Sequence, residues 1–379
     1  MEENKFLKNV RIIFGKYRTI KKIGSDSFNE IYLGKRILDN KPVTIKVEKI
    51  NTEHQILKQE AYTLYLLKGI GIPKVLSYGI SKKYKILILP LLGESLEDIY
   101  IKNGKQFSLP ESCMIAIQVL DRIEFIHSKY YIHRYIKPDN VLIGKEDPNI
   151  IYLVNFGLSK KYRSTKTKNH VRFSNTGRLT GTLRYASSNA LKGSEQSRRD
   201  DLISIGYMLI YFMKRELPWQ RIRDKNETER YIKIYKMKKE IKPEILCQGL
   251  PNEMVEYMKY VQHLGFEQDP DYKYLRNLFK SILRQLNVNI ERYLFSWIKA
   301  NNIPNFNNPI KRHKRRRRMH MNSKIYNNIV DNLSLNEKER NSSFNSSVNY
   351  SLGPAPPALP NLVISRNNSE GLFSLNNNI

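Results

Sequence analysis

The spacing of apolar residues changes near residue 95 of this 379-residue chain. Between residues 17 and 90, short β-rich runs predict strands, and one amphipathic stretch predicts a helix. The clearest strand signals lie at 30–33, 43–47 and 85–89, and the helical stretch lies near 55–68. The later spacing is helical and predicts helices near 111–127, 200–213, 253–264 and 274–286. The sequence therefore predicts an α+β protein with a small sheet plus one helix, followed by a larger helical part.

The pattern dissolves beyond residue 301, where Asn, Ser and Pro dominate. This part contains a basic segment, KRHKRRRR, that begins at Lys311 and ends at Arg318, and the low-complexity piece LGPAPPALP. Such a composition cannot bury enough apolar surface to offset the entropy lost on ordering. We therefore expect residues 301–379 to be a disordered tail.

Length and composition fit a protein with a large core. Hydrophobic residues make up 40% of the chain, which predicts one two-lobed unit or two domains. The sequence has no run of about 18 apolar residues, and its start, MEENKFLKNV, lacks the apolar stretch of a signal peptide. We therefore expect a cytoplasmic or nuclear protein that does not insert into membranes. Cys113 and Cys247 lack neighbours at metal-ligand spacing and are interpreted as buried thiols.

The formal net charge of +29 favours acidic partners such as phosphorylated segments, nucleic acid or acidic membrane surfaces. From residue 300 onward there are 11 Lys or Arg residues and 4 Asp or Glu residues, so a net +22 belongs to the preceding part. The alternative is a compositional bias that fills the solvated surface with lysine, because Lys, Asn, Ile and Tyr are frequent throughout.

Several separated segments resemble, in order and spacing, the casein kinase 1 family of Ser/Thr protein kinases. They are IGSDSFNEIYLG (23–34), VTIKVE (43–48), LLGESLEDIY (91–100), IHRYIKPDNVLIG (132–144), NFGLSKKYR (155–163), LTGTLRYASSNA (179–190) and PDYKYLRNLF (270–279). One such motif would be weak evidence, but the ordered set is specific. The resemblance implies a two-lobed protein kinase fold, with an N-terminal extension at 1–16, an N-lobe and hinge at 17–92 and a C-lobe at 93–300.

The resemblance also implies where ATP would bind. Lys46 is placed to neutralise nucleotide phosphates, with Glu60 on the following helix as its ion-pair partner. The alternative for this pair, taken alone, is two surface charges. Pro90 in the hinge lacks an N–H, but the main hinge donor would be the Leu92 N–H, so adenine recognition remains open. The other positions expected to line the nucleotide site are Ile23, Gly24, Ile31, Leu89 and Asn155.

The catalytic-loop segment matches the family in part. His133 and Arg134 match its start, Lys137 matches the lysine that would contact the transferring phosphate, and Asn140 matches the second metal ligand. Asp201 matches the helix residue whose carboxylate holds the backbone of this loop in kinases.

Two aspartates that phosphoryl transfer needs are missing. Tyr135 stands where the family has the aspartate that orients the substrate hydroxyl, and a phenol of pKa about 10 is a poor base at neutral pH. Asn155 stands where the family has a metal-binding aspartate, so Asn140 and Asn155 together form a weakened magnesium site. We therefore expect ATP binding to be possible, and magnesium binding to be weakened or absent.

The phosphate-binding loop departs from the family as well. Asp26 and Asn29 replace two of its glycines, where the backbone must approach phosphates closely, and Asp26 adds a negative charge there. Thr44 replaces the small alanine two residues before the strand lysine and narrows the roof over the adenine. Four sites on the same reaction path are therefore altered: the catalytic-loop segment, the metal-binding position, the phosphate-binding loop and the roof over the adenine. Together they predict impaired catalysis.

The family has a basic pocket that binds a phosphate or an acidic side chain near the substrate site. Arg184 and Arg230 fall at its positions, and the bidentate geometry of guanidinium groups suits phosphate. Arg221 replaces a family glycine near the pocket, where it either adds to the charge or is simply solvated.

We expect a casein kinase 1-like pseudokinase that acts as a binding or scaffolding module for protein partners, including phosphorylated or acidic segments. The alternative is an active or weakly active kinase, in which Lys46, Lys137 and Asn140 stabilise the transferring phosphoryl group without a carboxylate base. Nucleic-acid binding is a weaker third class, because segment 311–318 has no interleaved aromatic residues. We expect that segment to bind an import receptor, and the protein to be a monomer without membrane contact.

Overall fold

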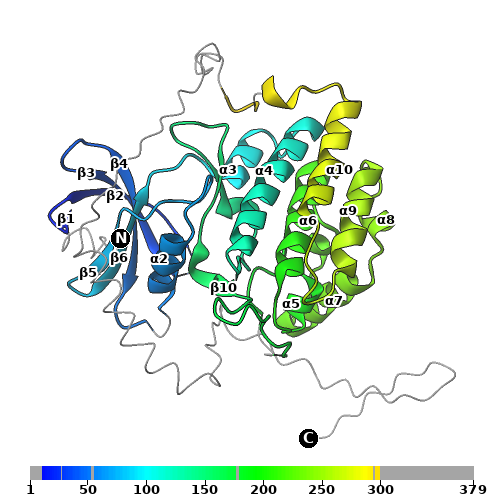
Figure 1. Ribbon diagram of the computed structural model, residues 1–379, viewed down its shortest axis with the longest axis horizontal. Coiled ribbons are helices and arrows are strands. Elements are labelled where there is room, and N and C mark those ends of the chain that lie inside the picture. The colour runs from blue at the N-terminus through cyan, green and yellow to red at the C-terminus, as the bar shows by residue number, and fades with distance from the viewer. Residues whose placement is uncertain (1–10, 27, 53–54, 176–178, 293–294, 299–379) are drawn as a thin grey trace, which may run out of the picture.

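The computed structural model describes residues 11–298, except 27, 53–54, 176–178 and 293–294. The expected disordered tail and its basic segment 311–318 lie outside the described residues. The described chain forms a small lobe rich in strands and a larger helical lobe, which confirms the predicted architecture (Figure 1). Among the described residues, no helix is long and apolar enough to cross a membrane.

The small lobe is built on an antiparallel sheet in the order β1-β2-β3-β4-β6-β5. Strand β1 precedes residue 17, the expected start of the small lobe. Part of the expected N-terminal extension therefore pairs with β2. The strand bounds are β1 Ile12–Ile13, β2 Tyr17–Ser25, β3 Glu30–Arg36, β4 Pro42–Lys49, β5 Ser77–Ser81 and β6 Tyr84–Pro90.

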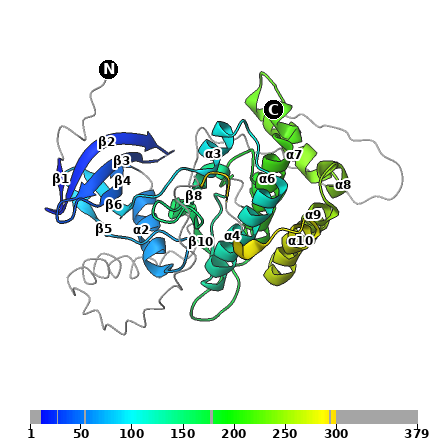
Figure 2. The ribbon, with the colours of Figure 1, turned by 90° about the horizontal axis from the view of Figure 1, so that it is seen from above.

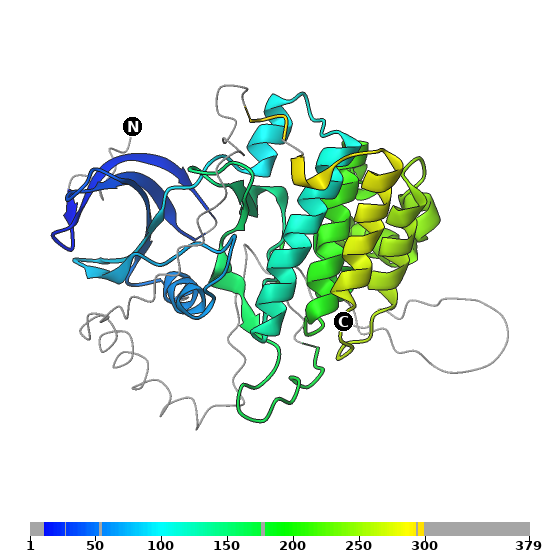
Figure 3. The ribbon, with the colours of Figure 1, turned by 45° about the horizontal axis from the view of Figure 1, so that its top comes forward.

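Strand β4 carries apolar residues on one face and a lysine on the other. Val43, Ile45 and Val47 are buried in an apolar core on one face of the sheet, together with residues of the neighbouring strands β3 and β6. Because successive side chains of a strand alternate between its faces, Lys46 lies on the opposite face. Helix α2 (Ile56–Leu66) covers this second face and lies between the sheet and the helical lobe (Figure 3). The alternation therefore directs Lys46 toward α2.

Helix α4 packs against α6 and α10 in the large lobe (Figure 2). Its N-terminus is set by a capping box, in which Ser108 and Glu111 satisfy each other's backbone N–H groups. Helix α9 packs against both α6 and α10 on the far side. The helix bounds are α3 Leu96–Lys102, α4 Leu109–Ser128, α5 Ser188–Leu191, α6 Arg198–Lys214, α7 Glu227–Glu240, α8 Pro243–Leu246, α9 Asn252–His263 and α10 Tyr272–Gln285.

Two short antiparallel strand pairs lie between the sheet and the large helices (Figure 2). Strand β7 (Tyr131–Ile132) pairs with β10 (Lys160–Lys161), and β8 (Val141–Ile143) pairs with β9 (Ile151–Leu153). These pairs hold the ends of two loops, 133–140 and 154–159, and place them opposite the β2–β3 turn and α2.

Candidate functional site

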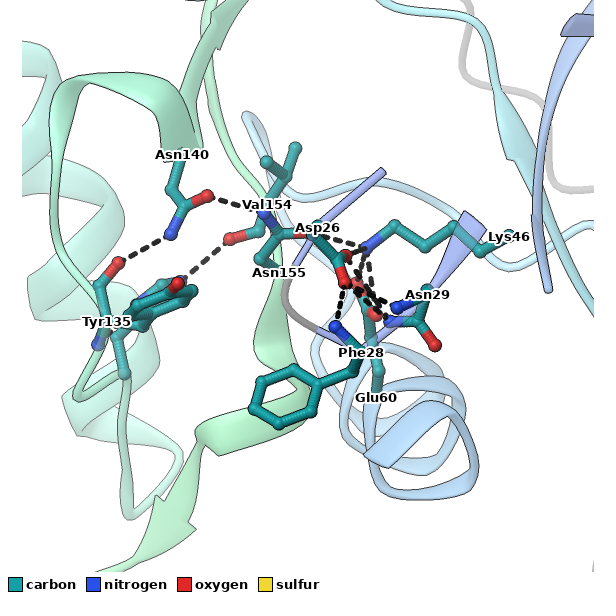
Figure 4. A network of polar contacts seen from close by, with 10 residues as sticks. Asp26, Phe28, Asn29, Lys46, Glu60, Tyr135, Asn140, Val154 and Asn155 are labelled. Atoms are coloured by element: carbon teal, nitrogen blue, oxygen red, sulfur yellow. Dashed lines mark hydrogen bonds and ion pairs between the residues drawn. The ribbon is translucent and has the colours of Figure 1, made fainter. Parts of the chain in front are cut away.

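Lys46 lies at the centre of a polar network that joins the two lobes (Figure 4). Its ammonium donates to Glu60 Oε1 at 2.6 Å, to Glu60 Oε2 at 2.9 Å and to Asn155 Oδ1 at 2.5 Å. The Asp26 carboxylate lies 3.9 Å away. A lysine ammonium has three N–H donors, and these three contacts use all of them. Lys46 is only 4% exposed, so the network is largely removed from water.

Glu60 is the carboxylate that holds Lys46 in place. It projects from α2 and is buried, and this burial raises the pKa of its carboxyl while the neighbouring Lys46 ammonium opposes the rise. Removing either partner would leave a buried charge without compensation, which is strongly destabilising. The pair therefore connects the position of α2 to that of the sheet.

The β2–β3 turn folds around the side chain of Asp26. Its Oδ1 accepts hydrogen bonds from the backbone N–H groups of Phe28 at 2.9 Å and Asn29 at 2.8 Å. The Asn29 side chain, which is 3% exposed, also donates to Asp26 Oδ1 at 3.1 Å. Aspartate commonly stabilises turns through such contacts with backbone N–H groups two or three residues ahead. This turn aims the Asp26 carboxylate at Lys46.

Tyr135, at the position expected for the catalytic base, packs in a small apolar cluster. It is 7% exposed and forms a small cluster with Ile56 of α2 and Leu158. Phe28 of the β2–β3 turn packs against the same cluster. The Lys137 ammonium lies 5.0 Å from the centre of the Tyr135 ring, within the range of a cation–π contact. Tyr135 thus connects the catalytic-loop segment to the turn and to α2.

His133 fixes the backbone on either side of this position. Its Nδ1 accepts from the Tyr135 N–H at 3.2 Å, and its Nε2 donates to the Val154 carbonyl oxygen at 3.0 Å. Both contacts fit the neutral ring protonated on Nε2. Burial lowers the pKa of His133, although Asp201 opposes the change, and this keeps the ring neutral.

Asp201 of α6 holds the start of the catalytic-loop segment. Its carboxylate accepts from the backbone N–H groups of His133 at 2.7 Å and Arg134 at 2.8 Å, and from His127 Nε2 at 2.9 Å. Burial alone would raise the pKa of Asp201, but the hydrogen bonds from His127 and the loop lower it below its ordinary value. Arg134 has a positive φ of 64°, so these contacts stabilise an otherwise unfavourable backbone conformation.

Asn140 and Asn155, the candidate metal ligands, are hydrogen-bonded to each other. The Asn155 amide nitrogen donates to Asn140 Oδ1, while Asn155 Oδ1 accepts from Lys46. The Asn140 amide nitrogen donates to the Tyr135 carbonyl oxygen at 2.7 Å. Both amide oxygens are therefore occupied by protein donors. Among the described residues, no group of three or more His, Cys, Asp or Glu side chains could hold a metal ion.

These contacts do not fit a nucleotide with magnesium. Magnesium prefers oxygen ligands in near-octahedral geometry and is usually held by carboxylates together with phosphates, whereas Asn140 and Asn155 offer neutral amide oxygens that already accept hydrogen bonds. A nucleotide phosphate beside Lys46 would also meet the like charge of Asp26.

The other residues expected at the nucleotide site lie around this network. Gly24 of β2 pairs with Ile31 of β3, which in turn pairs with Lys46. Ile23 is exposed, whereas Leu89 is buried near the end of β6, and Leu92 follows in the connection to α3. Ile23, Gly24, Ile31 and Leu89 thus lie on strands of the sheet that carries Lys46, and Leu92 lies in the connection to α3. None of these five belongs to the polar network described above, which joins Lys46 to Glu60 and Asn155.

The two arginines of the expected anion pocket come from different elements. Arg184 lies in the loop before α5, is exposed, and stacks its guanidinium 5.8 Å from the ring centres of Tyr185 and Tyr211. Arg230 lies on α7 and forms an ion pair with Glu227 at 3.6 Å. An exposed pair of this kind contributes little energy, so an incoming anion can displace it.

Arg221, expected near this pocket from the sequence, lies at the end of the short helix η3 (Pro218–Arg221). Its guanidinium forms an exposed ion pair with Glu216, five residues earlier. The Glu216 carboxylate compensates the charge of Arg221 at the surface. Arg221 therefore adds little positive charge to that of Arg184 and Arg230.

Lys238 is an unexpected residue near this face. It is 2% exposed and its ammonium donates to the carbonyl oxygens of Leu183 at 2.8 Å, Arg184 at 3.0 Å and Ala186 at 2.7 Å. Burial lowers its pKa well below the ordinary value. The available sequence signal was its position four residues after the buried Ile234, on the inner stripe of α7.

The protein kinase domain family matches residues 17–288, which is more than half of the chain. The chain therefore belongs to the protein kinase domain family. Protein kinase domains generally bind ATP between their two lobes, which is where the network around Lys46 lies in this chain.

Proposed function

We propose that this protein is a casein kinase 1-like pseudokinase, in which the kinase fold acts as a binding or scaffolding module. The observation that carries this proposal is the burial of Tyr135 against Ile56 and Leu158 at the position of the catalytic base. A phenol packed among apolar side chains presents no carboxylate that could orient a substrate hydroxyl.

The metal-binding positions support the same proposal. Asn140 and Asn155 use their amide groups to bind each other and Lys46, in place of the anionic oxygens that hold magnesium in active kinases. Weakened magnesium binding removes much of the charge neutralisation on which phosphoryl transfer depends.

We further propose that the helical lobe binds phosphorylated or acidic protein segments through Arg184 and Arg230. Arg184 is exposed, and the Arg230 side chain, which is 32% exposed, pairs with Glu227 at the surface, so each residue offers part of its guanidinium group to an anion. The net charge of +22 before residue 300 would draw such partners toward this surface. We expect the protein to act as a monomer in the cytoplasm or the nucleus.

The test is magnesium-dependent transfer of radiolabelled phosphate from ATP to casein by the full chain. We expect no transfer above that of the Lys46→Met variant, which removes the central ammonium. Turnover of about 1–100 per second, the ordinary kinase range, would overturn the proposal.

The second candidate is a kinase with residual activity. It is favoured by the assembled Lys46–Glu60 pair and by the contacts of Asp201 with the loop backbone, since both are features that active kinases require. In this case Lys137 would stabilise the transferring group, and the same assay would show slow transfer that Lys46→Met and Lys137→Ala both abolish.

A further inference from the structure

All three N–H donors of the Lys46 ammonium go to side chains of the same chain, two to Glu60 and one to Asn155. Two carboxylates and one amide oxygen surround the ammonium, at 2.6 Å for Glu60, 2.5 Å for Asn155 and 3.9 Å for Asp26. In a kinase that binds nucleotide, the same lysine shares its donors between one carboxylate and the phosphates. Here the third donor goes to the neutral Asn155 amide oxygen, and the Asp26 carboxylate is a second anion 3.9 Å from the ammonium.

The position of Asp26 is built into the local structure. Three donors hold its Oδ1: the backbone N–H groups of Phe28 and Asn29, and the Asn29 amide. Its Oδ2 is the atom that approaches Lys46. Oδ2 also accepts from the Asn29 amide, at 3.3 Å, so both oxygens are held by the neighbouring residues while Oδ2 faces the cation.

An apolar contact closes the same turn onto the large lobe. Phe28 packs against the cluster of Tyr135, Ile56 and Leu158, which brings together the β2–β3 turn, α2 and both loops of the site. The small cavity beside these side chains is lined by Asp26, Phe28, Asn29, Ile56, Glu60, Tyr135, Asn155, Gly157 and Leu158. Residues from both lobes thus fill the space next to Lys46.

We propose that Asp26 is a built-in competitor of nucleotide phosphate. Its Oδ2 lies 3.9 Å from the Lys46 ammonium, and Phe28 packs nearby against Tyr135, Ile56 and Leu158. A nucleotide phosphate must displace this carboxylate, and overcome its like charge, before it reaches Lys46. This inference goes beyond the proposed loss of transfer, because it concerns binding and holds whether or not the chain retains any kinase activity.

The experiment is a titration of the full chain with ATP, and separately with inorganic tripolyphosphate, without magnesium, followed by thermal shift. The main variant is Asp26→Asn, which keeps an Oδ1 acceptor for the turn and removes the charge. The matched control is Asp39→Asn, which removes one negative charge from the exposed pair with Arg36. Asp26→Ser is a second variant that keeps an acceptor in the same turn, should Asp26→Asn fold poorly.

We expect Asp26→Asn to bind both probes about tenfold more tightly than wild type, because a like charge within a few ångströms of the phosphates is removed. Asp39→Asn should match wild type. Equal gains in both variants would attribute the effect to overall charge and overturn the proposal. Unchanged affinity in both Asp26 variants, or tight binding by wild type, would overturn it too. The casein assay tests the pseudokinase proposal separately, since tighter binding does not restore a catalytic carboxylate.

Discussion

Replacing Tyr135 with aspartate restores the residue type that active kinases have, but the structure predicts that it destabilises the fold. The Tyr135 ring is 7% exposed and packs with Ile56, Leu158 and Phe28. Truncating a buried aromatic residue in a core costs about 3–5 kcal/mol. We take the lower end, about 3 kcal/mol, because this cluster is small and borders a cavity.

The assay is urea unfolding of the full chain, supported by thermal unfolding. A loss of about 3 kcal/mol corresponds to a fall in Tm of about 6–12 °C, given roughly 2–4 °C per kcal/mol for domains of 150–250 residues. Two controls separate the causes. Tyr135→Phe keeps the ring and should cost less than about 1 kcal/mol, and Tyr135→Leu removes the ring without adding a charge.

The pH dependence provides a further check. A carboxyl placed in this cluster has a folded-state pKa above its unfolded value of about 3.9, because burial disfavours the charged form. Its cost therefore grows as the pH rises from the unfolded pKa through the folded pKa, so Tyr135→Asp should be closer to Tyr135→Leu at pH 5 than at pH 8. If Tyr135→Asp is as stable as wild type at pH 8, the ring does not hold the lobes together and our reasoning is wrong.

Three further predictions concern other parts of the chain. Arg184→Ala combined with Arg230→Ala should weaken binding of a phosphorylated or acidic peptide, and wild-type binding should fall with added salt; unchanged affinity would mean that this pocket is not used. Deleting 311–318 from a fluorescent fusion should reduce nuclear enrichment, and an unchanged distribution would exclude an import signal there. His133 is neutral and its pKa is lowered, so folding stability should fall as the pH drops below about 6.5, and His133→Gln should flatten that slope in pH-dependent unfolding.

The main elements could be predicted from the sequence because their spacing reflects burial. The helix near 111–127 corresponds to α4 (Leu109–Ser128), and the strand near 43–47 corresponds to β4 (Pro42–Lys49). The Lys46–Glu60 contact followed from the motif order and is 2.6 Å in the structure. Such features depend on local periodicity and on the order of the motifs along the chain.

The conformation of the site could not be predicted in the same way. The sequence indicated that Asp26 would repel phosphate, but its contacts with Phe28, Asn29 and Lys46 depend on how the turn folds against residues far along the chain. The contacts of Lys238 could not be read from the sequence either, because its three acceptors are backbone carbonyls about 50 positions earlier.

The position of Lys238 makes α7 a mechanical connection between two parts of the helical lobe. Arg230 and Lys238 lie on the same 14-residue helix, about 12 Å apart along its axis. Lys238 is bonded to the backbone of the segment that carries Arg184. Lys238 therefore ties α7 to the backbone at Arg184, which fixes the spacing between the two backbone positions that carry Arg184 and Arg230.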